Sequence, residues 1–547
     1  MSKLSNAANE LREKAELRLD ETVKNFMGGD SYVINPLDTL RMITASSIFG
    51  EPSYYRDSKR GGRYCPSSLV TDVLVPKEYN NLDTETIMEK AIDAALDYDF
   101  GATLEWAGYL RHYYNMRLNP QVIMVRAAVH PKRKEFTEKN PGFFNQINQD
   151  IMSRADEPMT QMAYYLYMNK GKKNNIPSVI KRSWAKNLSE LNTYQVAKYK
   201  NHEIGMINAV RLCHASSPVI DTLMQTGTVV ADDDKKTWEN LRSEGKSWKE
   251  IFTSINMGHM ALLRNLRGVF TEVDDADFCE TYLNRLKTGV KGGKQFPFRY
   301  WSAIKAIESS SCNHKPLIID ALEECMDLAC DNLPKFKGKT MCLSDNSGSA
   351  WGAITSEYGT VTVAEIDNLS SVMTAACSEE GYVGKFGDRL INHPISKRRG
   401  ILDQAQKITA NRSNDVGGGT EGGIWEFFKK AIDNKEHWDN IFIYSDMQAG
   451  HGGLYGTGAQ QAEYRKYGYS CPHRDMYINV YKLIQDYRKK VNPKVNVFCV
   501  QTAGYNDVLV PEFAYRTAIM YGWTGKEAIF ANEYIQQWDA IESRNKQ

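Results

Sequence analysis

The pattern of apolar and polar residues changes near residue 335. Before that point, apolar residues recur at helical spacing in several segments. These segments are 84–100, 178–200, 203–217, 260–270 and 316–333. Short polar or proline-containing joints such as NKGKKNNIPS and HASSPV separate them. Successive amphipathic helices of this kind predict a degenerate α-solenoid, in which each helix pair buries its apolar face on the next pair.

After residue 335, the apolar residues form short runs rich in β-branched and aromatic side chains. The runs TMCLS, IFIYS and VNVFCV alternate with helical stretches, which are AEIDNLSSVMTAACSE, GIWEFFKKAIDN and MYINVYKLIQDYRKKV. Strands that alternate with helices predict a parallel sheet with helices on both faces. The sequence therefore predicts a multidomain protein, with a helical part over residues 1–335 and a doubly wound α/β domain over 336–540.

Oxygen-bearing side chains follow the predicted strands. Asp345, Ser347 and Ser349 come at alternate positions after TMCLS, Asp446 follows IFIYS, and Thr420 lies in the glycine-rich segment NDVGGGTEGG. Ligands of a doubly wound sheet bind at the carboxyl ends of its strands, and such oxygens suit Mg²⁺. We therefore predict a Mg²⁺ site of these five residues. The alternative is a loop whose Asp345 or serines cap the next helix, but it does not account for Asp446 and Thr420.

The same residues argue against catalysis. The hydroxyls are neutral, so a bound cation would remain electrophilic and would accept a carboxylate from a partner protein. The motif contains no paired acid and base, and nothing in it would activate Ser347 as a nucleophile. We predict no catalytic residue and no enzymatic activity. His451 follows in a second glycine-rich segment, which we interpret as a flexible rim or, alternatively, as a further functional element.

Composition adds broad limits. A chain of 547 residues, 42% hydrophobic and 25% charged, is typical of globular protein with more than one domain. No segment approaches the roughly 18 uninterrupted apolar residues of a membrane helix. The polar N-terminal residues lack the apolar core of a signal peptide, and the ten cysteines form no C-x-x-C pair. We expect a cytoplasmic protein with buried thiols and no membrane association.

Charge is unevenly distributed although the net charge is only +1. Residues 101–200 contain 16 Lys and Arg against 7 Asp and Glu, an excess of nine positive charges. A basic block of this size attracts polyanions even in a neutral protein. The alternative interpretation is a solvated helical surface without a ligand.

Several segments, in order along the chain, resemble the Ro autoantigen family, whose N-terminal part is the TROVE module. LNTYQVAKYKNHEIGMINAVRLCHASSP is similar to the family's Lys-Tyr-Lys helix and the following helix that ends Arg-Leu-x-His. MALLRNL and FPFRYWSAIKAI resemble further family segments. The D-x-S-x-S motif, the later Thr and the strand-terminal Asp match the metal-ion-dependent adhesion site of von Willebrand factor A domains. VGKFGD and GGGTEGG also match that domain.

The resemblance implies a ring of HEAT-like helical repeats joined to a von Willebrand factor A domain. It implies a ribonucleoprotein that binds Y RNA-like small noncoding RNAs and misfolded RNAs with single-stranded 3′ ends. Such a protein would act as a monomeric scaffold in RNA quality control or degradation, with an exoribonuclease such as polynucleotide phosphorylase as a partner.

The resemblance also assigns RNA contacts. Lys198, Lys200 and His214 match the family's RNA-contacting positions. Spacing alone would make His214 a helix cap or a satisfied core residue. Weaker candidates on a lysine-rich helix face are Lys181, Arg182 and Lys186. The chain departs from the animal members, which carry an Arg two residues after the second Lys, because Asn201 and His202 stand there in a shorter segment.

Two other functions stay open. In the first, the chain is a Mg²⁺-dependent protein-adhesion scaffold without a physiological RNA ligand. In the second, it is a hydrolase that uses the metal, which would require a general base near Asp345. The basic block favours RNA binding over the first, and the sequence identifies no such base for the second. The sequence names neither the RNA nor the protein partner.

Overall fold

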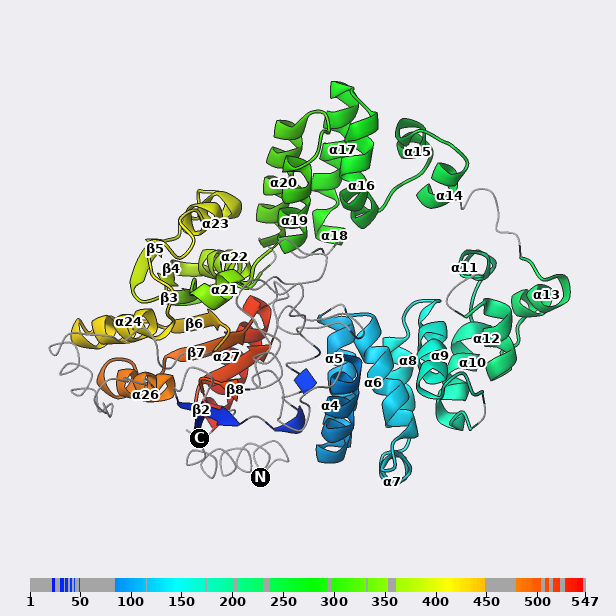
Figure 1. The fold of residues 1–547 in the computed structure, drawn as a ribbon, viewed down its shortest axis with the longest axis horizontal. Coiled ribbons are helices and arrows are strands. Elements are labelled where there is room, and N and C mark those ends of the chain that lie inside the picture. The colour runs from blue at the N-terminus through cyan, green and yellow to red at the C-terminus, as the bar shows by residue number, and fades with distance from the viewer. Residues whose placement is uncertain are drawn as a thin grey trace. The chain divides into compact units, whose positions relative to one another are not determined.

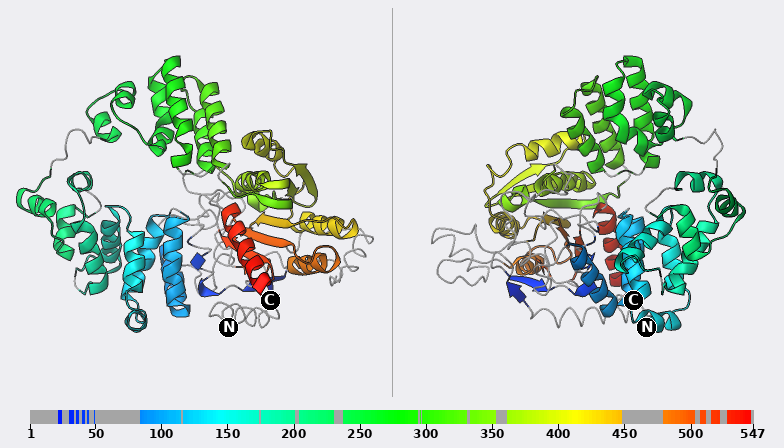
Figure 2. Two further views of the ribbon diagram at one scale, coloured as in Figure 1. Left: turned by 180° about the vertical axis from the view of Figure 1, so that it is seen from behind. Right: turned by 45° about the vertical axis from the view of Figure 1, so that its right-hand side comes forward.

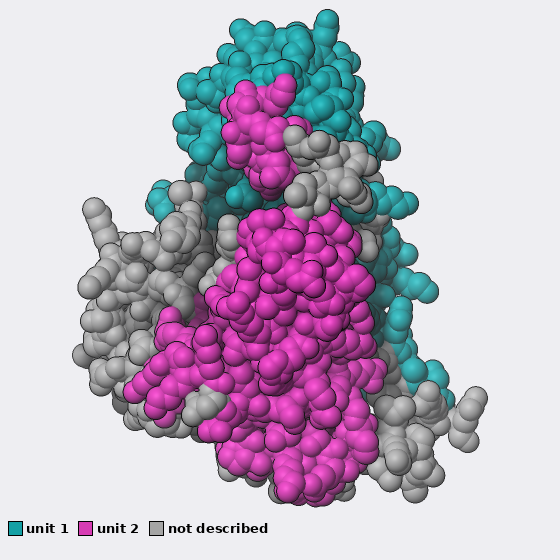
Figure 3. All heavy atoms as spheres, turned by 90° about the vertical axis from the view of Figure 1, so that its right-hand side faces the viewer, with its two compact units in different colours: residues 1–34, 52–80, 247–547 teal, residues 35–51, 81–246 magenta. Residues whose placement is uncertain are grey.

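The computed structural model describes most of the chain, in two compact units (Figure 3). Unit 1 comprises residues 1–34, 52–80 and 247–547, and unit 2 comprises residues 35–51 and 81–246. The described residues are 22–24, 30–33, 35–37, 40–41, 44, 49, 84–114, 116–173, 175–200, 204–229, 237–293, 295, 297–330, 333–352, 361–447, 479–502, 507–510, 515–521 and 527–544.

The described elements of unit 2 are helical. They are α4 (Thr84–Tyr98), α5 (Phe100–His112), α6 (Leu118–Val129), α7 (Arg133–Lys139), α8 (Phe143–Ile151), α9 (Glu157–Met168), α10 (Ser178–Ser189), α11 (Thr193–Lys198), α12 (Met206–Cys213), α13 (Pro218–Thr226) and α14 (Trp238–Ser243). Polar side chains begin several of these helices. Asp99 accepts a hydrogen bond from the Ala102 backbone N–H at 2.9 Å, and Ser217 caps α13 in the same way.

A buried amide network joins four of these helices. Gln161 of α9 donates through Nε2 to Gln121 of α6 at 2.7 Å and to Asn148 of α8 at 2.8 Å. Trp184 of α10 donates through Nε1 to the Gln161 Oε1 at 2.8 Å. All four side chains are buried, and buried polar groups of this kind specify how neighbouring elements align. The network therefore sets the position of α10.

Six further helices are described at the start of the 247–547 part of unit 1. These are α15 (Trp248–Ser254), α16 (His259–Glu272), α17 (Ala276–Thr288), α18 (Val290–Gly293), α19 (Pro297–Glu308) and α20 (Lys315–Cys330). Helices α16, α17, α19 and α20 lie side by side (Figures 1 and 2). Asp327 of α20 accepts a hydrogen bond from the Ile401 backbone at 2.9 Å, so this bundle is joined to the α/β part of the same unit. No helix among the described residues is long and apolar enough to cross a membrane.

The α/β part contains a mixed sheet of six strands in the order β5-β4-β3-β6-β7-β9. The strands are β3 (Phe336–Asp345), β4 (Ser378–Phe386), β5 (Leu390–Pro394), β6 (Asn440–Ser445), β7 (Asn496–Gln501) and β9 (Thr517–Tyr521). Among these described strands, the edge pair β4 and β5 is the antiparallel one, and the other neighbours are parallel. A smaller sheet joins β1 (Thr22–Lys24), β2 (Asp30–Val33) and β8 (Asp507–Val508).

Helices cover both faces of the larger sheet, as the alternation in the sequence predicts. The helices of this part are α21 (Gly348–Gly352), α22 (Val363–Ala376), α23 (Ile401–Thr409), α24 (Glu421–Asp433), α26 (Val480–Lys490) and α27 (Glu527–Arg544), of which α21 and α23 pack on α22. Leu343 and Ile443 share a core with α24 and α26. On the opposite face, the Tyr444 hydroxyl lies 2.6 Å from the Thr374 hydroxyl of α22, and Phe498 stacks on Trp538 of α27.

Two sequence predictions are wrong in detail. The segment 178–200 forms two helices, because Asn192 and Gln195 make a capping box that starts α11 anew. The helix predicted over 364–379 ends at Ala376, and strand β4 begins at Ser378. The strands predicted from TMCLS, IFIYS and VNVFCV correspond to β3, β6 and β7.

Glu542 attaches α27 to the sheet. Its carboxylate accepts hydrogen bonds from Lys494 Nζ at 2.9 Å, Tyr515 Oη at 2.7 Å and Arg516 Nη1 at 2.7 Å. The Lys494 bond, with those from Tyr515 and Arg516, lowers the pKa of Glu542 to about 2. Because this folded pKa lies below the ordinary value, the stabilisation is present above about pH 4 and is lost as the pH falls towards 2.

We therefore expect Glu542→Gln to lower the free energy of unfolding of unit 1 by about 1–2 kcal/mol at pH 6. The difference from the parent should shrink towards zero near pH 2, because the parent carboxylate is then protonating. Urea unfolding at a series of pH values measures this. A difference independent of pH would show that the charge of Glu542 is not what stabilises α27.

Candidate functional site

The carboxyl ends of β3 and β6 bring two buried aspartates to one place. These strands are parallel neighbours, with Ser344 opposite Tyr444, so Asp345 and Asp446 leave the sheet at the same edge. The Asp345 carboxylate accepts from the Ser347 backbone N–H at 2.8 Å and from the Ser445 hydroxyl at 2.6 Å. Both aspartates are fully buried.

The hydroxyls predicted to belong to the site lie beside these carboxylates. Ser349 donates to Asp446 Oδ2 at 2.7 Å, and its oxygen lies 3.1 Å from that of Ser347. Thr420 is 6% exposed and immediately precedes α24. Its loop reaches the motif, because the Gly348 N–H donates to the Gly418 carbonyl at 2.9 Å. The structure therefore gathers Asp345, Ser347, Ser349 and Asp446 directly, with the Thr420 loop against them.

The electrostatics of the group fit a cation. Burial, followed by the charge of Asp446, raises the pKa of Asp345 above its ordinary value. Two buried carboxylates that repel each other are costly unless a positive charge compensates them. Oxygen donors are the ligands that Mg²⁺ takes. The residues present therefore fit a hard divalent cation held by Asp345, Asp446 and the neighbouring hydroxyls.

A third carboxylate, which was not predicted from the sequence, interacts electrostatically with Asp345 and Asp446. Asp367 on α22 is fully buried, and its Oδ1 has no hydrogen-bond partner among the described residues. Burial, followed by the charge of Asp345, raises the pKa of Asp367 well above its ordinary value. The charge of Asp446 acts in the same direction. Asp367 lies in the middle of an apolar helical segment, so no motif in the sequence marks it.

Close backbone contacts explain the glycines around Thr420. A Cβ on Gly422 would lie 2.2 Å from the Asp388 carbonyl oxygen, and one on Gly387 would lie 2.3 Å from the Gly417 oxygen. Asp388 also accepts from the Gly418 N–H at 3.1 Å. These contacts press the VGKFGD and GGGTEGG segments together and fix the loop that carries Thr420.

We expect Gly422→Ala to destabilise unit 1 by about 1–3 kcal/mol, because a backbone oxygen must move to admit the methyl group. The Mg²⁺ affinity should fall as well, since the Thr420 loop shifts with it. Thermal unfolding with and without Mg²⁺ measures both effects. Gly292→Ala is the control, because its Cβ would enter open space. Equal behaviour of the two variants would contradict this explanation of the motif.

The six candidate RNA contacts lie on or beside three consecutive helices of unit 2 (Figure 1). On α10, Arg182 and Lys186 are exposed and Lys181 is half-buried. Lys198 ends α11 and is exposed, with its ammonium 5.6 Å from the centre of the Tyr199 ring. The half-buried Lys200 follows, and its carbonyl accepts from the first N–H of α12 at 3.0 Å.

His214 ends α12 in a left-handed conformation, with φ 61° and ψ 42°. Its backbone N–H donates to Val210 at 2.8 Å and its side chain is exposed, so the backbone makes the cap and the imidazole faces solvent. Ser216 donates through its N–H to the Ser189 hydroxyl at 3.0 Å, which ties this turn to the end of α10. Lys186 and His214 thus belong to the linked ends of α10 and α12. Asn201, His202 and His451 lie outside the described residues.

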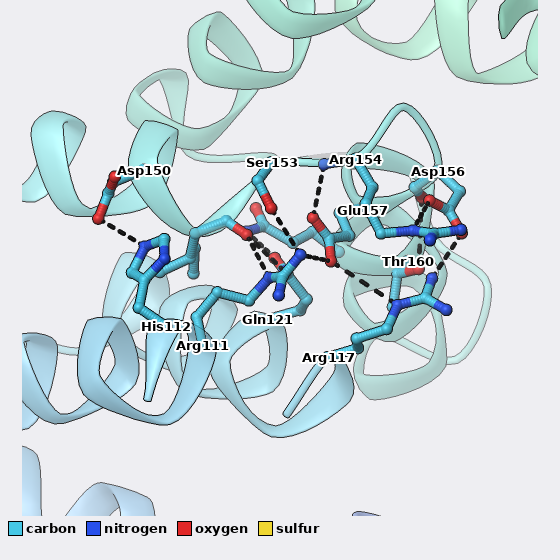
Figure 4. Close-up of polar contacts among 12 residues, drawn as sticks. Arg111, His112, Arg117, Gln121, Asp150, Ser153, Arg154, Asp156, Glu157 and Thr160 are labelled. Atoms are coloured by element: carbon cyan, nitrogen blue, oxygen red, sulfur yellow. Dashed lines mark hydrogen bonds and ion pairs between the residues drawn. The ribbon is translucent and has the colours of Figure 1, made fainter. Parts of the chain in front are cut away.

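A cluster of charged side chains lies at the start of α9 (Figure 4). Arg117 and Arg154 both contact the buried Asp156, at 2.6 and 3.0 Å, and Arg154 also donates to the Tyr199 hydroxyl at 3.0 Å. Glu157 is 1% exposed, and burial raises its pKa although Arg111 opposes this. The cluster therefore connects the start of α9 to the residue between the two candidate lysines. Sequence analysis missed it, because a count of charges does not show which of them pair.

These elements define a class of protein, in which a helix-rich region precedes a mixed α/β sheet with an oxygen-rich site at its strand ends. No family model matches the sequence, and no curated protein sequence matches it significantly. The structure is similar to the crystal structure of the Ro (RSR) protein of Deinococcus radiodurans, with a TM-score of 0.57. The match covers 91% of this chain and 100% of that chain at 12% sequence identity. The chain therefore has the fold of a bacterial Ro protein, and the predicted resemblance is confirmed at the level of the fold.

Proposed function

We propose that this protein is an RNA-binding scaffold of the Ro type. The observation that supports this most strongly is the set of exposed cationic side chains at the ends of α10, α11 and α12, with His214 facing solvent. Phosphate contacts of this kind supply most of the affinity of RNA binding, and an exposed imidazole can donate to a phosphate or stack on a base. The helical region would then be a TROVE module with HEAT-like repeats.

The proposed ligands are small structured noncoding RNAs similar to Y RNAs, and misfolded RNAs with single-stranded 3′ ends. The protein would act as a monomeric cytoplasmic scaffold in RNA quality control, with an exoribonuclease as a partner. We assign it no catalytic step. Its α/β domain would be of the von Willebrand factor A type and would hold Mg²⁺ through Asp345, Ser347, Ser349, Thr420 and Asp446.

A second candidate function rests on the cation site alone. A buried set of oxygen donors at strand ends is also suited to metal-dependent docking of a protein partner, with RNA playing no physiological part. This scaffold would retain its partner when the lysines of α10 and α11 are removed and would lose it on chelation.

One experiment separates the two proposals. The protein is expressed in cells, crosslinked with ultraviolet light and purified under denaturing conditions, and the attached RNA is sequenced. RNA binding predicts enrichment of a few small structured transcripts, with crosslinks mapping to α10–α12. Recovery of RNA in proportion to its cellular abundance would contradict the RNA proposal and favour the adhesion scaffold.

A further inference from the structure

We propose that Asp367 is a third carboxylate of the cation site, which holds a water molecule bound to the ion and gives the site a net negative charge. This inference rests on the proposed cation site and deepens it. Asp367 comes from α22, which packs against β3 and β6, the two strands that supply Asp345 and Asp446. Asp367 comes twenty-two residues after Asp345 in the sequence and is not one of the five residues predicted to hold Mg²⁺.

The hydrogen bonding of Asp367 is incomplete among the described residues. Thr502, which follows β7, donates to Asp367 Oδ2 at 3.4 Å, a long and weak bond. Thr502 is itself held at the site, because its N–H donates to the Ser445 carbonyl at 3.1 Å. The Asp367 Oδ1 atom has no partner among the described residues although the residue is 0% exposed. A buried carboxylate oxygen without a donor costs free energy unless another group, here a bound water, supplies one.

The role of Asp367 is indirect. Among the described residues, no group of three or more His, Cys, Asp or Glu side chains is arranged to hold a metal by itself. Mg²⁺ typically keeps several waters and takes only one or two protein carboxylates. Asp345 and Asp446 are those two carboxylates, so Asp367 is left to accept a hydrogen bond from a water on the ion. Partners that orient bound waters and ligands in this way contribute strongly to metal affinity.

The negative charge of Asp367 changes the net charge of the cation site. The nearby buried Lys385 on β4 is engaged by Asp415 at 2.7 Å, so its charge is already balanced. A divalent cation beside three buried carboxylates leaves one negative charge, whereas two carboxylates would leave none. The five motif residues alone suggested an electrophilic metal that needs a partner's carboxylate. With Asp367 included, the site holds the cation without a partner and repels an incoming acidic group.

The test compares Asp367→Asn with the parent by calorimetric titration of the full-length protein with Mg²⁺ alone. Asparagine keeps the shape and still accepts from Thr502, but it removes the charge. We expect Mg²⁺ to bind roughly 10–100-fold more weakly. In metal-free protein at a pH high enough to ionise Asp367 despite its raised pKa, the melting temperature should rise, because asparagine carries no charge that repels Asp345 and Asp446. Asp403→Asn is the matched control, since Asp403 is a partly exposed partner of Lys407 on α23, and it should change neither value.

The outcomes are distinct. If Asp367→Asn binds Mg²⁺ as the parent does while Asp345→Ala loses binding, Asp367 has no part in a site that is otherwise real. If the parent itself does not bind Mg²⁺, the proposed cation site fails as well. A lower melting temperature of metal-free Asp367→Asn would identify a structural acceptor and overturn the proposal. Should that variant not fold, Asp367→Ser is measured instead, and failure of both to fold overturns the proposal in the same way.

Discussion

Removing Lys198 and His214 together should weaken the binding of small structured RNA by about 1–3 kcal/mol for each of the two side chains. Both side chains are exposed, so their removal takes little from the folded state. The substitutions are Lys198→Ala and His214→Gly. Glycine is chosen because His214 has a φ of 61°, which alanine adopts only with strain. A phosphate contact releases counterions, so the salt dependence should also become shallower, by about one in log–log slope for the lysine.

The matched control is Lys139→Ala. Lys139 lies in the same basic block and the same unit, is exposed, and pairs with Glu135 one helical turn earlier. The Lys139→Ala substitution removes the same charge as Lys198→Ala. Lys139, however, lies on α7 and not among the candidate RNA contacts. Filter binding or anisotropy with a labelled RNA of transfer RNA size measures both variants. Equal reductions in affinity would mean that the RNA responds to overall charge, and the assigned surface would then be misplaced.

The second large effect is expected at the cation site, where Asp345→Ala should abolish measurable Mg²⁺ binding. Removing a residue that only supports a metal ligand costs about 10–100-fold in affinity, so removing a fully buried ligand should cost more than about 100-fold. Unit 2 contains none of these residues, so its helices and its RNA binding should be unaffected. Calorimetric titration with Mg²⁺, together with RNA binding in the presence of a chelator, measures the two properties separately. Retained Mg²⁺ binding would place the cation elsewhere, and simultaneous loss of RNA binding would contradict the division between the two units.

The sequence predicted the inner part of the sheet well and its edges poorly. Strands β3, β6 and β7 are buried at most positions and therefore appear as short continuous apolar runs. Strand β4 has two exposed glutamates at its second and third positions and includes glycines, so it lacks that signature. The pairing of β2 with β8 joins residues 30–33 to 507–508, and no local pattern encodes a contact across such a separation.

The residues of the candidate site that come directly after a strand could be predicted from the sequence. Asp345, Ser347, Ser349 and Asp446 meet because parallel neighbours end at one edge of the sheet. Asp367 was not predictable, because a carboxylate within a helix usually marks a solvated position and only tertiary packing buries it here.

The basic block shows a similar limit of sequence analysis. The side chains of Arg111 and Arg117 are paired with buried or half-buried carboxylates within unit 2, and so are those of Arg126 and Arg154. The excess of positive charge counted along residues 101–200 therefore overstates what these arginines offer a ligand. Lys186 of α10 and Lys198 of α11 are exposed, and so are Lys134, Lys170, Lys172 and Lys173 elsewhere in the block.

Affinity for RNA as a function of salt tests the central proposal most directly. Purified parent protein is titrated with a labelled structured RNA of transfer RNA size at several salt concentrations, with an unstructured polyanion such as heparin as competitor. Our account predicts saturable binding that weakens steeply with salt and survives an excess of competitor at low salt. Absence of binding in low salt, or complete displacement by an equal charge of heparin, would contradict it.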